Sequence, residues 1–228
     1  MDMLQIREKE VFESLRKMKG LRFVVIGGYA VNAYALPRFS VDCDIVIEGS
    51  VEAAKIDRIL TELGYEKKES PKTAYSALFE RYEKDLGNSF KVSFDILISE
   101  VLDRQTKTSF SADWILKNSA IRTLKGKTII EKLDARIINI DALFVMKMIS
   151  CRSTDIRDLF MLVPNLEDIR FVREEVSSRY DFNDRFKKIK GKITSKKFKD
   201  GLQGVYGLLN TEIFEKSVNA ILKLEPKD

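Results

Sequence analysis

Hydrophobic residues along the first part of the chain switch between helical and strand-like spacing. Apolar positions recur at helical intervals within residues 4–19, which predicts an amphipathic helix. The run LRFVVIGG (21–28) is short, apolar and ends at two glycines, which predicts a strand followed by a turn. YAVNAYAL (29–36) then predicts a short helix that is stopped by Pro37, since proline cannot continue a helix.

The same mixture of elements continues to about residue 140. We expect a strand over 40–48, a helix over 51–63, strands over 73–83 and 90–99, and weaker strands near 120–131 and 135–140. Gly64 follows the helix, where a glycine cap is common. Gly87 and Asn88 predict a turn between the strands on either side of them. This order of elements favours a mixed sheet with flanking helices.

The pattern changes near residue 141. From DALFVMKMISC (141–151) onward nearly every segment has helical spacing, and Asp141 has the side chain of a helix N-cap. A chain of 228 residues fits one large domain or two small ones. We therefore predict an α+β (α/β) fold in two parts. Residues 1–140 would form a domain with a mixed sheet and flanking helices, and residues 141–228 a helical domain.

Three aspartates fall on the predicted strands at positions that can share one face of a sheet. Side chains alternate along a strand, so Asp42 and Asp44 in VDCDIVI point the same way, away from the apolar positions. Asp95 in KVSFDILI stands opposite to the apolar face of its own strand. If the two strands are neighbours, the three carboxylates converge, and like charges that close together require a cation. For each aspartate alone, a solvated strand face is the alternative.

Two glycines before these aspartates suit an anionic ligand. Gly27 and Gly28 lie between a predicted strand and a predicted helix, and without Cβ atoms they let phosphate oxygens approach the backbone amides. The N-terminus of the following helix also favours negative charge. Two divalent ions on the aspartates would neutralise the same phosphates and clamp a phosphoryl transfer. Strand–Gly–Gly–helix is also a common connection without a ligand, which stays the alternative.

The composition narrows the chemistry further. The chain has no histidine, which excludes Ser-His-Asp and Cys-His catalysis, histidine general bases and histidine metal ligands. Any metal would be bound mostly by carboxylates, and oxygen ligands select Mg²⁺ or Mn²⁺. The two cysteines, Cys43 and Cys151, form no CxxC pair, so a zinc knuckle is excluded. Without an export signal we expect no disulfide between them.

Two segments resemble a known family. GGYAVNAYALPRFSVDCDIVI (27–47) looks like the signature of the DNA polymerase beta nucleotidyltransferase superfamily, which has GG, a short helix, an arginine and a DxD strand. DALFVMKMISCRSTDIRDLFML (141–162) resembles the helical motif of the AbiEii and minimal nucleotidyltransferase branch, with a lysine, an arginine and a closing aspartate. The resemblance extends over roughly residues 22–162 and implies a nucleotidyltransferase-like fold.

The resemblance also implies roles for the first motif and for the third aspartate. Asp42 and Asp44 would bind Mg²⁺ or Mn²⁺, and Gly27 and Gly28 would cradle the triphosphate. Asp95 would be the third metal-binding carboxylate, which aligns the acceptor hydroxyl and takes its proton.

Three more positions would belong to the nucleotide site, each with an alternative. Arg38 would bind the nucleotide, or merely fix the loop by pairing with a carboxylate. Lys147 would contact the nucleotide or its phosphates, or extend its ammonium from an apolar helix to solvent. Asp158 would support that site, or join Arg152 and Asp155 in a ladder of surface salt bridges.

Tyr29 departs from the family pattern, which usually has Ser or Thr directly after the glycines to help hold a phosphate. The departure favours a second hypothesis, in which the fold is kept without catalysis. The protein would then act as a binding module, such as the antitoxin-like partner in a toxin–antitoxin pair. The retention of Asp42, Asp44 and Asp95 together favours the enzyme.

A lysine-rich segment follows in the helical part. RFKKIKGKITSKKFKD (185–200) carries seven lysines and one arginine, with Phe186 and Phe198 between them. It could bind RNA phosphates, which would make a plain RNA-binding protein a third hypothesis, or it could be a solvated helix face. The net charge of +5 favours polyanionic partners mildly.

The sequence thus predicts metal-dependent transfer of a nucleoside monophosphate from an NTP to an acceptor hydroxyl. The acceptor could be RNA, a protein or a small molecule. No apolar run approaches the roughly 18 residues of a membrane span. The N-terminal residues also lack the apolar stretch of a signal peptide. We therefore expect a cytoplasmic protein that does not act at a membrane.

Overall fold

The chain forms two compact units. The computed structural model describes residues 2–69, 79–207 and 210–225. Unit 1 consists of residues 1–33, 37–101 and 109–138, and unit 2 of residues 34–36, 102–108 and 139–228. The expected domains, 1–140 and 141–228, differ from these units mainly in the two short segments that unit 2 takes from the N-terminal part of the chain.

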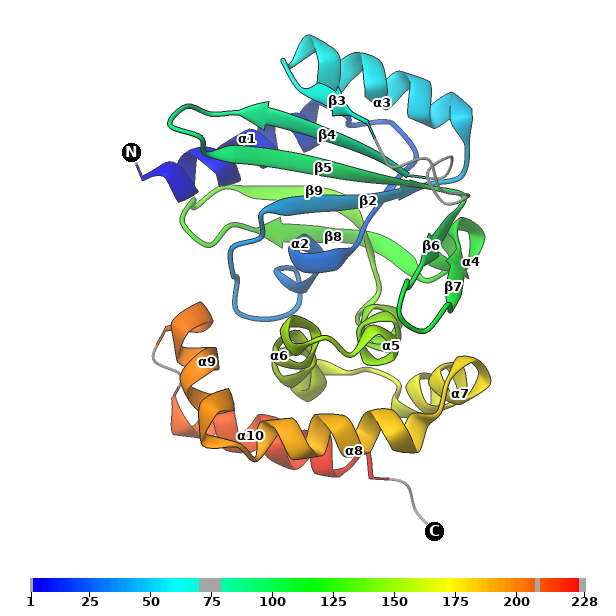
Figure 1. Ribbon diagram of the computed structural model, residues 1–228, viewed down its shortest axis with the longest axis vertical. Coiled ribbons are helices and arrows are strands. Elements are labelled where there is room, and N and C mark those ends of the chain that lie inside the picture. The colour runs from blue at the N-terminus through cyan, green and yellow to red at the C-terminus, as the bar shows by residue number, and fades with distance from the viewer. Residues whose placement is uncertain (1, 70–78, 208–209, 226–228) are drawn as a thin grey trace. The chain divides into compact units, whose positions relative to one another are not determined.

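Unit 1 is built on a mixed seven-stranded sheet with the strand order β3-β4-β5-β2-β1-β9-β8 (Figure 1). Its strands are β1 (Val24–Val25), β2 (Asp42–Ile47), β3 (Glu66–Lys68), β4 (Phe79–Asp85), β5 (Lys91–Ile98), β8 (Ser119–Lys125) and β9 (Lys132–Ile138). β2 runs parallel to β5 and β1 parallel to β9, whereas the other neighbouring strands of this sheet are antiparallel. The short strands β6 (Glu100–Leu102) and β7 (Ser109–Ser111) form a separate two-stranded sheet.

The helices of unit 1 flank this sheet. They are α1 (Met3–Lys17), α2 (Gly27–Val31), α3 (Ser50–Glu62) and α4 (Ala112–Lys117). Both α1 and α3 contact β5, where Val92, Phe94 and Ile96 are fully buried. Figure 1 shows α2 on the other side of the sheet from α1 and α3. Alternation along β5 therefore directs its polar residues towards the side on which α2 lies.

Unit 2 is mostly helical. Its helices are α5 (Ile140–Ser150), α6 (Ser153–Leu162), the 3₁₀ turn η2 (Val163–Asn165), α7 (Ile169–Arg179), α8 (Phe182–Ile193), α9 (Lys196–Tyr206) and α10 (Thr211–Leu222). Helix α5 is buried on nearly all sides, as expected of a helix that is apolar almost all round. The ring of Phe160 on α6 packs against Phe198 of α9 and Phe214 of α10, at centroid distances of 5.2 and 5.1 Å. These contacts form an aromatic part of the core.

The predicted fold class is confirmed: a mixed sheet with flanking helices is followed by a helical part. In the described residues no helix is long and apolar enough to span a membrane. The predicted strand over 73–83 is seen from Phe79, and its first part lies outside the described residues. Gly87 and Asn88 both have positive φ, 96° and 54°, in the predicted turn.

The predicted helix over 29–36 is wrong in its bounds, because α2 begins at Gly27 and ends at Val31. The helix ends well before Pro37. The buried Asn32 side chain accepts a hydrogen bond from the Arg38 amide at 3.0 Å and donates one to the Arg38 carbonyl at 2.9 Å. This reciprocal pair of hydrogen bonds closes the loop and replaces the helical continuation.

The predicted N-cap of α5 is also wrong. Asn139 occupies that position, and Asp141 lies inside the helix. The Asp141 carboxylate accepts hydrogen bonds from the backbone amides of Glu167 and Asp168, at 2.9 and 3.1 Å, and so ties α5 to the turn before α7. Burial raises the pKa of Asp141 above its ordinary value even though these hydrogen bonds oppose the shift.

Candidate functional site

The register between β2 and β5 brings the three predicted aspartates to one face of the sheet. Asp44 lies directly beside Asp95 on the parallel neighbouring strand, and Asp42 lies beside Ser93. The intervening Cys43 points to the opposite, buried face. The Ser93 hydroxyl donates a short hydrogen bond to Asp42 Oδ1. The predicted convergence of carboxylates is therefore present in unit 1.

An arginine that the sequence analysis did not single out lies among these carboxylates. Arg81 on β4 is the antiparallel partner of Asp95. Its Nη2 donates to Asp42 Oδ1 at 2.7 Å, and its Nη1 is 3.6 Å from Asp95 Oδ2. Its Nε donates to Glu83 at 3.2 Å. One guanidinium thus neutralises part of the negative charge on this face.

The charges around Arg81 hold its guanidinium firmly in the protonated state. Partial burial by itself would lower the pKa of Arg81, but the carboxylates of Asp95 and Asp42 outweigh burial and raise it. Lys91 adds a second positive charge nearby, 3.2 Å from Glu83 Oε2. The face is therefore a network of acidic and basic side chains.

The glycine pair packs directly against the aspartate strand and the loop before it. Gly27 has a φ of +63°, and a Cβ atom there would overlap the Asp44 carboxylate. A Cβ on Gly28 would overlap the Ser40 hydroxyl and lie 3.1 Å from Arg38 Nη2. Protein atoms alone therefore disfavour a side chain at both positions, and the positive φ adds strain for any other residue at Gly27. The two glycines also place the start of α2 next to Asp44.

Arg38 lies beside the second glycine, Gly28. Its Nη1 donates to the carbonyl of Phe39 at 2.9 Å, and its backbone is held by Asn32. The guanidinium is therefore oriented over Gly28 by its own loop. This geometry puts a positive charge next to the amides at the N-terminus of α2.

Tyr29 is turned into the core. Its side chain is 2% exposed and is among the largest fully buried side chains of the protein. Burial raises the pKa of the Tyr29 hydroxyl well above its ordinary value, and the nearby Cys43 and Glu8 raise it further. The residue that departs from the family pattern therefore neither offers its hydroxyl to a phosphate at the surface nor fills the space above the glycines.

The three carboxylates have the donor atoms that a hard divalent cation prefers, but they are not arranged around a common metal position. Asp42, Asp44 and Asp95 supply only oxygen ligands, as Mg²⁺ and Mn²⁺ prefer. Within residues 2–69, 79–207 and 210–225, however, no three acidic or cysteine side chains are placed to hold a metal ion. The guanidinium of Arg81 instead bridges Asp42 and Asp95, so a metal ion at these two carboxylates would compete with it.

Unit 2 brings Lys147 and Asp158, which the resemblance assigns to the nucleotide site, together with Asp155. Lys147 Nζ is 2.7 Å from Asp158 Oδ2 and 3.2 Å from Asp155 Oδ1. All three side chains are buried, so the surface salt-bridge ladder considered from sequence is wrong. Ser150 donates to Asp155 at 2.8 Å, and Tyr206 contacts Asp158 at 3.3 Å. The lysine thus connects α5 to α6, and Asp158 connects α6 to α9.

The lysine-rich segment spans α8 and the first part of α9. Phe186 and Phe198, which the sequence placed between the lysines, are both buried in the core. They are therefore not available to stack on bases. Lys187, Lys188 and several lysines of α9 remain exposed, so the segment is a basic helix face over an apolar core.

Comparison with known proteins gives a likeness of fold. No family model and no curated protein matches the chain. Among solved structures it is similar to JHP933 from Helicobacter pylori and to a "putative nucleotidyltransferase" from H. pylori. Both matches have a TM-score of 0.53 and 14% identity over 98% of this chain, and cover 92% and 95% of those chains. The fold is thus nucleotidyltransferase-like, and the AbiEii branch stays a prediction.

Proposed function

We propose that the protein is a nucleotidyltransferase, which moves a nucleoside monophosphate from an NTP to an acceptor hydroxyl on RNA, protein or a small molecule. The observation that carries this proposal is the convergence of Asp42, Asp44 and Asp95 on one sheet face beside the glycine turn. The likeness of the fold to a structure named as a nucleotidyltransferase supports the same class.

The bonds that form and break define the roles of the residues. The acceptor oxygen would bond to the α-phosphorus, the bond from that phosphorus to the α–β bridging oxygen would break, and pyrophosphate would leave. Asp95 would accept the hydroxyl proton, since a carboxylate can serve as a general base. The chain has no histidine to take this role.

The start of α2 would hold the phosphates. The amides of Gly27, Gly28 and Tyr29 belong to the first turn, whose N–H groups have no acceptor within the helix. The N-cap residue Ile26 provides no side-chain hydrogen bond to them. Arg38 adds positive charge beside Gly28. These groups suit the triphosphate of an NTP.

Asp42, Asp44 and Asp95 would hold Mg²⁺ or Mn²⁺. When bound, such an ion would neutralise phosphate charge and stabilise the displacement. The buried side chains of Lys147 and Asp158 already satisfy each other, so the proposal does not need them at the nucleotide. Their direct contact with the nucleotide stays a prediction from the resemblance.

A second function is favoured by one observation. Arg81 already neutralises Asp42 and Asp95, as expected of a site that has no need for a metal. The protein would then keep the fold as a binding module, such as an antitoxin-like partner. Tyr29 no longer favours this alternative, because its side chain is part of the core.

Labelled nucleotides test the proposal. We would incubate the protein with each NTP labelled at the α-phosphate, with Mn²⁺ or Mg²⁺, and with total cellular RNA and protein. Label should enter one fraction, which identifies the acceptor class, and Asp95→Asn should abolish the transfer. Asp113→Asn on α4 is the matched control, since it removes the same charge from an exposed side chain. If no NTP supports transfer and none binds at millimolar concentration, the nucleotidyltransferase proposal is wrong and the binding-module function takes its place.

A further inference from the structure

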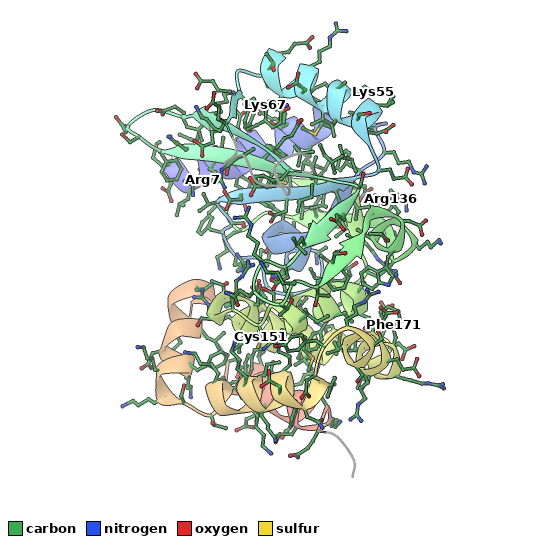
Figure 2. The ribbon with its side chains drawn as sticks, turned by 45° about the vertical axis from the view of Figure 1, so that its right-hand side comes forward. Arg7, Lys55, Lys67, Arg136, Cys151 and Phe171 are labelled. Carbon is green, nitrogen blue, oxygen red and sulfur yellow. The ribbon has the colours of Figure 1, made fainter. Side chains whose placement is uncertain are left out.

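Unit 2 contains a cavity of about 520 Å³ beside the start of α6. This volume lies within the range of roughly 300–1,000 Å³ that is typical of small-molecule sites. Its walls come from the 102–108 segment, from the turn between α5 and α6, and from one face of α8. Cys151, labelled in Figure 2, marks that turn. None of the described residues that line the cavity is acidic.

Two lysines of α8, Lys188 and Lys192, line the cavity. Lys188 and Lys192 are four residues apart and so lie on the same helix face. In the described part of the chain neither has an ion-pair partner, whereas Lys190 between them pairs with Glu225 at 2.6 Å. Gly191 also lines the cavity and has open space where a Cβ would be. Two ammonium groups on one wall repel each other unless an anion lies between them.

Arg152 supplies a third positive charge that a buried carboxylate holds in place. Its Nη2 is 3.2 Å from Asp103 Oδ2, and its side chain is 52% exposed. The other oxygen of Asp103 accepts hydrogen bonds from the amides of Gln105 and Thr106, at 3.1 and 2.8 Å. Asp103 thus orders two residues of the cavity wall, Gln105 and Arg152. Although burial alone would raise the pKa of Asp103, hydrogen bonds from Thr106 and the charge of Arg152 lower it.

We propose that this cavity binds the diphosphate group of a small phosphorylated ligand, such as pyrophosphate or a nucleoside triphosphate. Lys188, Lys192 and Arg152 line one open pocket, which suits several negative charges on adjacent phosphates. The backbone of RNA spreads its charges along an extended path instead. Ser153, the first residue of α6, also lines this pocket. The inference does not depend on catalysis in unit 1.

Calorimetry with pyrophosphate and with an NTP tests the cavity directly. Both titrations would contain EDTA and low salt, so that binding by the unit 1 carboxylates through a metal cannot contribute. Wild type should bind, and the double variant Lys188→Gln/Lys192→Gln should bind about 10- to 100-fold more weakly, because two charge-assisted contacts are lost. Inorganic phosphate should bind more weakly than pyrophosphate, because it presents fewer charges to the three cations.

The matched control is Lys187→Gln/Lys199→Gln. It removes the same net charge from the same segment, but both lysines are exposed and do not line the cavity. This variant should bind pyrophosphate within about twofold of wild type, since only screened long-range attraction changes. Thermal unfolding would verify that both double variants are folded. Equal weakening in the two variants would overturn the proposal in favour of general electrostatic attraction.

Two further outcomes would also overturn the inference. Absence of pyrophosphate and NTP binding by the wild type at low salt would leave a cavity with no phosphate ligand. Binding of an RNA oligonucleotide, but not of pyrophosphate, would assign the lysines to RNA instead. Failure of nucleotidyl transfer would change neither result, because the titrations contain no metal and no acceptor.

Discussion

Each unit holds a cation between two aspartates, and the two arrangements differ in exposure to solvent. In unit 2, Lys147 bridges two aspartates of α6, and the three side chains are 9%, 12% and 1% exposed. In unit 1, Arg81 bridges Asp42 and Asp95, and the side chains are 35%, 37% and 14% exposed. The distances are similar, at 2.7 and 3.2 Å for the lysine and 2.7 and 3.6 Å for the arginine.

This difference in burial separates a structural contact from an exchangeable one. A buried charge that loses its partner cannot be solvated, so breaking such a pair costs roughly 3–5 kcal/mol. A charge near the surface can turn to water or to another ion, and an exposed pair contributes only about 0–1 kcal/mol. We therefore infer that Lys147 holds its helices together, whereas Arg81 is a cation that another cation can replace.

The largest expected effect is the loss of the buried cation. Lys147→Met keeps much of the side-chain volume but leaves Asp155 and Asp158 without their counter-charge. We expect the free energy of unfolding to fall by about 3–5 kcal/mol, as measured by urea denaturation at neutral pH. Arg170→Gln is the control, because it breaks an exposed pair with Glu174 on α7 and should cost less than about 0.5 kcal/mol. A loss below about 1 kcal/mol for Lys147→Met would remove the distinction between the two triads.

The next largest effect concerns Tyr29, whose side chain is buried in the core and does not face the carboxylate site. Tyr29→Ser should lower the free energy of unfolding by about 3 kcal/mol, because it empties a filled position in the core. Tyr29→Phe keeps the ring and should stay within about 1 kcal/mol of wild type. Denaturation of both variants checks this. If Tyr29→Ser binds NTP more tightly and loses no stability, position 29 belongs to the phosphate site and not to the core.

Apolar spacing predicted most of the strands and the change to helices near residue 141, and the resemblance added the nucleotidyltransferase-like fold. Strand alternation put Asp42 and Asp44 on one face, and Asp95 joins them because β2 and β5 are neighbours. Arg81 could not be found in this way. Its place depends on the pairing of β4 with β5, and it lies 39 residues from Asp42 in the sequence. The ion pairs of Lys147 with Asp155 and Asp158 were missed for a related reason. An apolar period shows that a position is buried, but not that two aspartates from the next helix neutralise it.

Removal of the Arg81 guanidinium should raise the affinity of the carboxylates for a metal ion. Arg81→Gln removes a positive charge that lies between Asp42 and Asp95, so we expect Mn²⁺ to bind about tenfold more tightly, or about 1.4 kcal/mol. Calorimetry with Mn²⁺ alone measures this without any need for transfer activity. Lys91→Gln is the control, because it removes one positive charge from the same face, where Lys91 lies 3.2 Å from Glu83 Oε2. Unchanged Mn²⁺ affinity in Arg81→Gln would show that Arg81 does not compete with a metal.

The smallest expected effect is the change in stability when Asp42, one carboxylate of the exposed triad, is replaced. Asp42→Asn breaks the pair with Arg81, but the guanidinium keeps Asp95 and Glu83, and water reaches it. Without metal we expect the free energy of unfolding to change by less than about 1 kcal/mol, and repulsion from the neighbouring carboxylates is relieved in part. Asp158→Asn makes the same change at a buried pair and should cost several times more, since Lys147 then keeps a single counter-charge. Denaturation of the two variants side by side, with EDTA present, measures the ratio. Equal losses would mean that exposure does not distinguish the triads, and that Arg81 belongs to the structure of unit 1 as firmly as Lys147 does to that of unit 2.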